Sequence, residues 1–208
     1  MKELCIFFGV LITTSACRAP IDESYINKIC DNLQGSKIDT SINSLSYVTS
    51  VSDQYLGMKP LIIPSDTFLL RIRHDTDSSL KLLEFKDYNN QCSIVVYQIP
   101  IDQESQHIVF NKSKDNITNY ETRYDQISKG REFIQQLKKT NLLTLPNYRD
   151  IPGYPTYEHT TPTYIFEYSR FNCYKVFWYL NPYANRNRFK EAESVANFLD
   201  FLKKEFNF

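Results

Sequence analysis

One pair of neighbouring side chains in a long irregular segment has residue types suited to acid–base chemistry. Glu158 and His159 are adjacent in a segment that carries four prolines between Pro146 and Pro162. Prolines prevent regular structure, and a long irregular loop in a compact domain often carries function. Glu158 could act as a general acid or base with His159 as its partner. Neighbours in an extended segment point to opposite sides, however, so the sequence favours a non-catalytic role for this pair.

The other two histidines are explained without catalysis. His74 ends an expected strand beside Asp75 and Asp77, which could together hold a cation but are typical of a solvated hairpin turn. His107 opens a short expected strand and is assigned to the surface. With only five glycines and no nucleophile elbow, phosphate loop or metalloprotease motif, the sequence predicts neither a cofactor nor a metal. It favours a protein that is not an enzyme.

Five cysteines are present, and two of them, Cys5 and Cys17, belong to the N-terminal region. Cys30, Cys92 and Cys173 remain, and they include no C-x-x-C pair of the kind that binds zinc. Three thiols do not make a disulfide framework. We expect small buried side chains with at most one bridge, for which Cys92 and Cys173 are the candidates.

The N-terminal stretch LCIFFGVLITTSACRAP, residues 4–20, has the pattern of an export signal. Its apolar run follows Lys2 and is shorter than the roughly 20 residues that a membrane-spanning helix needs. Small residues then lead into Cys17, as in the lipobox of bacterial lipoproteins. The sequence therefore predicts that residues 1–16 are a signal peptide that is removed and that Cys17 becomes a lipidated N-terminus. Ordinary cleavage without lipid, or a buried first strand, are the alternatives.

Composition restricts the partners of the expected mature chain, residues 17–208, which is long enough for one domain. Lys plus Arg and Asp plus Glu each number 24, so no net positive field exists to attract nucleic acid. The 15 tyrosines and 14 phenylalanines suit half-buried strands. Nucleic-acid binding is therefore disfavoured.

Hydrophobic periodicity predicts strands in runs that are interrupted by helices. The expected strands are residues 67–73, 80–85, 93–99, 107–111, 164–168 and 174–180. The expected helices are residues 22–33, a segment from about Ile127, and residues 189–206 with Asn187 as N-cap, while residues 112–125 are expected to be a polar connection. This order predicts a single α+β domain, a mostly antiparallel sheet of about six strands with two or three helices on one face.

The last expected strand is aromatic on both faces. The set assigned to the core is Tyr174, Val176, Trp178 and Leu180. Phe177 and Tyr179 lie on the opposite face and, with Tyr154 and Tyr157 of the loop, form a possible binding face if nothing covers them. The sequence leaves open whether this face is exposed or is covered by a second layer.

Several segments resemble a group of uncharacterised lipoproteins from Bacteroidetes-type bacteria. They are FLLRIRHD at 68–75, a helix leading to a Leu-Pro turn at 133–146, residues 164–168, a Tyr-x-x-x-Trp strand with an Asn-Pro step at 174–182, and the closing helix at 192–206. The resemblance covers roughly half of the chain. It implies an α+β architecture and an envelope location, and no activity.

Together these features predict a lipid-anchored protein of the outer membrane that faces the periplasm or the cell surface. Without a catalytic set, the favoured function is binding, with an envelope protein or a secreted toxin as partner; an immunity-type protein is one concrete version. The alternative is a small envelope hydrolase or carbohydrate-handling enzyme that uses the loop from Tyr154 to His159.

Overall fold

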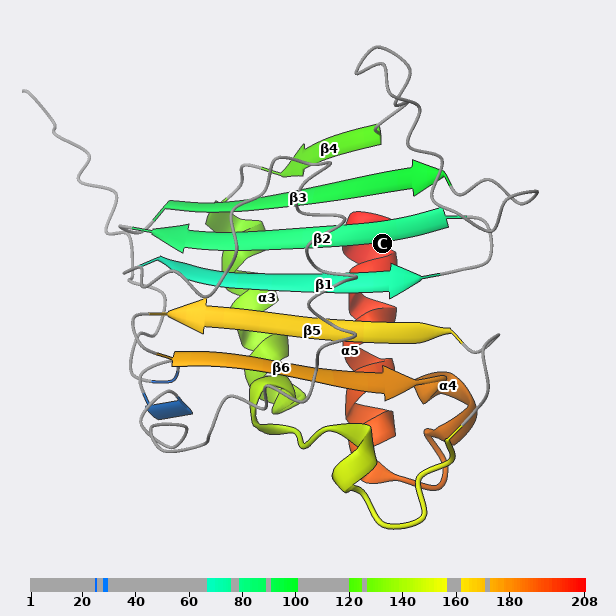
Figure 1. Cartoon of the computed structure of the whole chain (residues 1–208). Coiled ribbons are helices and arrows are strands. Elements are labelled where there is room, and N and C mark those ends of the chain that lie inside the picture. Colours follow the sequence, from blue (N-terminus) through cyan, green and yellow to red (C-terminus); the bar gives the residue numbers. More distant parts are fainter. Residues whose placement is uncertain are drawn as a thin grey trace, which may run out of the picture.

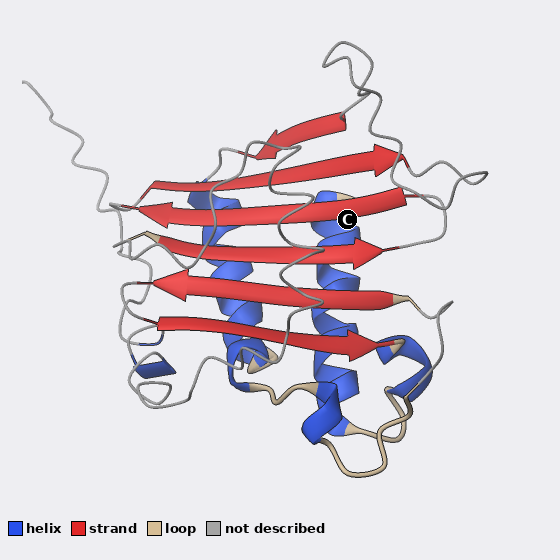
Figure 2. Ribbon diagram, viewed as in Figure 1, coloured by secondary structure: helices blue, strands red, loops and turns tan. Residues whose placement is uncertain are grey.

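The computed structural model describes residues 25, 28–29, 67–75, 79–88, 91–100, 120–124, 127–156, 162–170 and 173–208. These residues form a six-stranded antiparallel sheet in the order β4-β3-β2-β1-β5-β6. The strands are β1 (Phe68–Asp75), β2 (Ser79–Tyr88), β3 (Gln91–Pro100), β4 (Tyr120–Tyr124), β5 (Thr163–Arg170) and β6 (Cys173–Leu180). Helices α3 (Ile127–Lys139) and α5 (Lys190–Phe206) cover one face of the sheet (Figures 1 and 2). The predicted α+β fold is confirmed.

Strand β1 lies between a meander and a hairpin. Strands β1 to β4 pair in sequence order, and the β5–β6 pair adds to the other side of β1. Because side chains alternate along a strand, Phe68, Leu70 and Ile72 share the face toward the helices. Ile72 is opposite Leu83 on β2 and Phe166 on β5, and all three are fully buried. The alternation in the sequence therefore fixes the register of the central strands.

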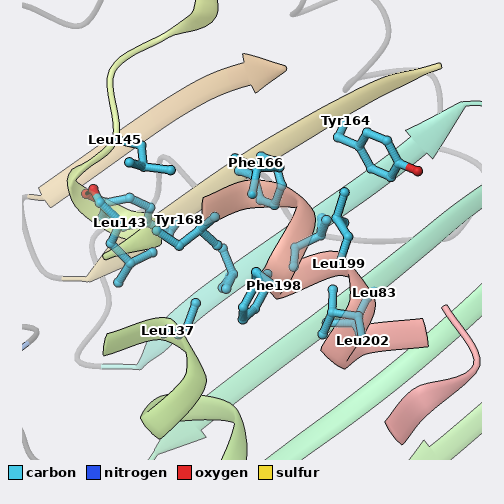
Figure 3. Close-up of a cluster of buried hydrophobic side chains, with 14 of the residues drawn as sticks. Leu83, Leu137, Leu143, Leu145, Tyr164, Phe166, Tyr168, Phe198, Leu199 and Leu202 are labelled. Atoms are coloured by element: carbon cyan, nitrogen blue, oxygen red, sulfur yellow. Dashed lines mark hydrogen bonds between the residues drawn. The ribbon is translucent and has the colours of Figure 1, made fainter. Parts of the chain in front are cut away.

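Aromatic contacts join the two helices to the sheet. The Phe133 ring on α3 stacks on Phe85 of β2 with centroids 4.5 Å apart, and it meets Phe198 of α5 edge-on at 5.6 Å. Figure 3 shows the neighbouring part of this interface, with Phe166 of β5 and Phe198 of α5 among the labelled buried side chains. Burial of each such side chain contributes about 1.5–3 kcal/mol, so the helix–sheet contact is the main source of stability.

The irregular segment after α3 contains two 3-10 turns, η2 (Leu142–Thr144) and η3 (Tyr148–Asp150). Side chains of the sheet hold this segment through its carbonyl groups. The Tyr168 hydroxyl donates to the Leu143 carbonyl at 3.0 Å, and Lys175 Nζ donates to the same carbonyl at 3.2 Å. These contacts show why a proline-rich segment is ordered here, since its backbone acceptors are satisfied from the sheet.

Two elements and one helix boundary differ from the sequence prediction. Strand β4 lies inside the stretch predicted as a polar connection; its short YETRY sequence suits an edge strand, which tolerates charge. A short helix, α4 (Pro182–Asn185), follows β6 with Asn181 as its cap. Helix α5 begins after Phe189, so the prediction of Asn187 as N-cap is wrong.

Other predicted elements fall partly or wholly outside the described residues. The expected strand at 107–111 lies outside them. Of the expected helix at 22–33, only Tyr25, Lys28 and Ile29 are described; they are helical, and Ile29 is buried. Within the described ranges, no helix has the length and apolar character needed to cross a membrane.

Candidate functional site

A pocket of about 270 Å³ lies between the helix-covered face of the sheet and the C-terminal part of the chain. The sheet contributes His74, Lys81 and Tyr164. The helices and the chain end contribute Tyr183, Leu199, Asp200, Lys203 and Phe208. Polar and aromatic side chains therefore line a single hollow at the edge of the core.

The strand registers bring the three sheet residues together. His74 of β1 is opposite Lys81 of β2 on one side and Tyr164 of β5 on the other. On their own strands, His74, Lys81 and Tyr164 each lie two positions from a fully buried residue. These buried residues are Ile72, Leu83 and Phe166, respectively. Because side chains alternate along a strand, all three pocket residues point to the same face as the buried row. The pocket therefore lies beside the buried apolar row of the sheet, where polar side chains replace apolar ones. Figure 3 shows Tyr164 beyond Phe166 on β5.

Three titratable side chains of the pocket, His74, Tyr164 and Tyr183, are held in their neutral forms. The His74 ring stacks on Tyr164 with centroids 4.2 Å apart. Burial, followed by the charge of Lys81, lowers the pKa of His74 to about 4. Burial raises the pKa of Tyr164 to about 12, with Asp200 adding to the effect, and burial likewise raises the pKa of Tyr183. At neutral pH these three side chains are uncharged.

The two lysines of the pocket have no acidic partner among the described residues. Lys81 Nζ donates to the Asn207 carbonyl at 3.4 Å. Neither Lys81 nor Lys203 has a carboxylate within 4.0 Å in the part of the chain that the structure describes. Asp200, the acidic side chain of the lining, faces Arg186 at 3.5 Å and hydrogen-bonds with Tyr183. The pocket therefore carries positive charge next to an aromatic wall.

We expect low pH to destabilise the protein through His74. The folded-state pKa of about 4 is below the ordinary value of 6.5, so the unfolded chain takes up a proton between these pH values while the folded chain does not. Stability should therefore fall as the pH drops from about 6.5 toward 4. The half-buried ring still meets solvent, which reduces the loss to about 1–2 kcal/mol. Urea unfolding at a series of pH values should show a steeper acid decline for wild type than for His74→Gln, and parallel profiles would contradict this.

The aromatic face of β6 is covered, so the alternative of an exposed binding face is wrong. Phe177 and Tyr179 are fully buried, and Tyr154 is 6% exposed. The hydroxyls of the two tyrosines make hydrogen bonds within the protein. The Tyr179 hydroxyl donates to the Pro146 carbonyl at 2.9 Å, and the Tyr154 hydroxyl donates to the Leu180 carbonyl at 3.0 Å. The second layer is α5 together with the irregular segment.

The assignment of the other β6 face to the core is confirmed at Leu180, which is buried, and is wrong for the remainder of that face. Tyr174, Val176 and Trp178 are only half-buried, whereas Phe177 stacks on Phe166 at 5.0 Å in the main core. Both faces of this strand are comparably apolar in sequence. The choice between them is made by the helices, which pack on the side of Phe177 and Tyr179.

Several predicted site residues lie outside the described residues. These are Cys17, Tyr157, Glu158 and His159. The proposed roles of Glu158 and His159 therefore stay predictions. Tyr154, the described member of that loop, is committed to the core by its hydrogen bond to Leu180. Within the described ranges, no three His, Cys, Asp or Glu side chains gather as metal ligands.

The predicted disulfide between Cys92 and Cys173 is wrong. Cys92 keeps its thiol, whereas Cys173 takes part in a disulfide. Cys92 lies on β3 and Cys173 on β6, with three strands between them. Strands are about 4.8 Å apart, so the two residues are roughly 19 Å apart, and a disulfide requires Cα atoms within about 7 Å.

We expect non-reducing peptide mapping to join Cys173 to Cys30. Ile29, the neighbour of Cys30, is buried in the same core cluster as Cys173. Reduction, or Cys173→Ser, should lower the free energy of unfolding by about 2–4 kcal/mol because the unfolded chain loses a long cross-link. Cys92→Ser is the control, and it should leave the map unchanged. A bridge from Cys173 to Cys17 would refute both this pairing and lipidation of Cys17.

No family model matches the chain, and no curated protein matches it.

The pocket was missed by sequence reasoning, although a signal for it existed. His74, Lys81 and Tyr164 each end or begin a row of alternating apolar residues with a polar side chain. Only the strand order reveals that the three rows are neighbours.

Proposed function

We propose that this chain is a lipid-anchored protein of the cell envelope that binds a partner rather than transforming a substrate. The location rests on residues 4–20, with a short apolar run that leads into Cys17. The resemblance to uncharacterised Bacteroidetes-type lipoproteins supports the same location. An immunity-type protein that binds a secreted toxin is a concrete version of this function.

The pocket is the observation that carries the binding role. Catalysis of proton transfer works best with a group whose pKa lies near the operating pH. The pKa of His74 is lowered to about 4 and that of Tyr164 is raised to about 12, so both are poor proton acceptors and donors at neutral pH. As neutral groups they are suited to hydrogen bonding and stacking with a ligand, and the lysines add charge.

The location is tested by comparing the expressed protein with Cys17→Ala. We expect the wild type to fractionate with membranes, to begin at Cys17 and to carry acyl mass, and the variant to lose all three properties. A soluble wild-type protein without lipid would overturn the anchored location.

The binding role is tested by affinity capture from envelope extract. The wild-type protein should retain a specific partner, identified by mass spectrometry, that Lys81→Met/Lys203→Met retains less well. Lys190→Met/Lys204→Met is the matched control, because both of these lysines are largely exposed and neither lines the pocket. Recovery of no specific partner would count against the proposal.

A further inference from the structure

We propose that the pocket binds the carboxylate of an aromatic acid group, with Lys81 and Lys203 supplying the charge and the His74–Tyr164 stack supplying the wall. The inference rests on the proposed function in that it takes the chain to be a binding protein. It adds the chemical class of the ligand and the residues that recognise it.

Charge is the first argument. Lys81 is half-buried and its ammonium reaches only a backbone carbonyl, while Lys203 makes no ion pair in the described part of the chain. Two cations that share a hollow repel each other, and an anion placed between them relieves this cost. Asp200 does not fill that role, because it faces Arg186 and Tyr183. The C-terminal carboxylate lies farther than 4.0 Å from both lysines.

Shape and apolar surface are the second argument. The His74 and Tyr164 rings are nearly parallel, with an angle of 13° between them, and the Phe208 ring lies 6.5 Å from His74. Leu199 adds an apolar surface that is 3% exposed. A cavity of about 270 Å³ is below the usual range for drug-sized ligands and suits one ring with a small substituent.

Specificity follows from the uncharged side chains. Tyr164 can donate a hydrogen bond to a carboxylate, and uncharged His74 leaves its ring available for stacking. The Tyr183 hydroxyl is already used by Asp200. A free aromatic acid and a phenylalanine at the C-terminus of a protein partner present the same chemistry. Both are therefore candidate sources of the group.

The first arm of the test is titration of the full mature protein in detergent with benzoate and with its neutral analogue benzamide, by ligand-detected NMR. We expect benzoate to bind at least about tenfold more tightly, since a hydrogen bond to a charged group is worth roughly a factor of ten. Lys81→Met and Lys203→Met should each weaken benzoate binding about tenfold, and Lys204→Met should leave it unchanged. Lys203 is exposed and makes no ion pair in the described part of the chain, so its variant should fold even if Lys81→Met does not.

The second arm uses a short peptide that ends in phenylalanine, as its free acid and as its amide. Tighter binding of the acid peptide than of benzoate identifies a protein terminus as the source, and the reverse order identifies a free acid. Equal binding of benzoate and benzamide, or an equal effect of all three lysine variants, overturns the inference. If benzoate binds no more tightly than benzamide while the wild-type protein still captures an envelope partner, the pocket inference fails and the binding function stands. If no partner is captured either, both fail.

Discussion

Replacing Glu84 with Gln should lower the free energy of unfolding by about 3 kcal/mol, one of the largest effects expected in this protein. Glu84 of β2 is directly opposite Arg71 of β1, and the two side chains are 2% and 3% exposed. The Arg71 Nε to Glu84 Oε2 distance is 2.8 Å, and Lys86 Nζ lies 2.6 Å from Glu84 Oε1. The amide would leave the buried guanidinium without this negative charge.

A double variant separates the free-energy cost of a buried charge without its partner from the net contribution of the ion pair to stability. Arg71→Met/Glu84→Met removes both buried charges, so it should be less destabilising than Glu84→Gln. Lys86→Met is the control; Lys86 is 49% exposed, and its loss should cost less than about 1 kcal/mol. Urea unfolding of the four proteins measures these differences. A double variant that is less stable than Glu84→Gln would contradict the argument.

This ion pair illustrates a feature that the sequence did not predict. Arg71 and Arg73 alternate with Leu70 and Ile72 along β1, which reads as an ordinary two-faced strand with one face in water. Arg73 is nevertheless only 1% exposed. Alternation tells which residues share a face, but it does not tell whether the polar face meets solvent.

The α+β fold was predictable because its strands and helices have distinct periods. Strands β1, β5 and β6 alternate with a period of two, and α5 carries a broad apolar stripe at helical spacing. A mostly antiparallel sheet was also predictable from the order of the strands and helices. Local pattern was enough wherever one face of an element was clearly more apolar than the other.

The predictions about sites and the disulfide that failed depended on long-range arrangement. Phe177 and Trp178 are equally suited to a core, so the orientation of β6 depends on which side α5 occupies. The prediction of a Cys92–Cys173 disulfide was wrong because strands β2, β1 and β5 lie between β3 and β6. The pocket draws on three strands, two helices and the chain end, which no local pattern connects.

The second large effect is expected at Gly130, where α3 packs most closely on the sheet. A Cβ added at Gly130 would lie 2.0 Å from Cys92 Sγ and 3.0 Å from Cys92 Cβ. Gly130→Ala must therefore displace the thiol or the helix, and such overpacking costs about 1–3 kcal/mol. Alanine by itself favours a helix by up to about 1 kcal/mol over glycine, so any net loss must come from this contact.

A double-mutant cycle assigns that loss to one pair of atoms. In a Cys92→Ala background the sulfur is gone, and Gly130→Ala should cost much less than it does in wild type. A residual penalty is expected because the Cβ of residue 92 remains at 3.0 Å. Ser128→Ala is a control on the same helix, at an exposed position. Thermal and urea unfolding give the coupling energy, which should be about 1–2 kcal/mol. A value near zero would mean that α3 does not rest on Cys92, and the close approach of helix and sheet that makes glycine necessary at this position would have to be placed elsewhere.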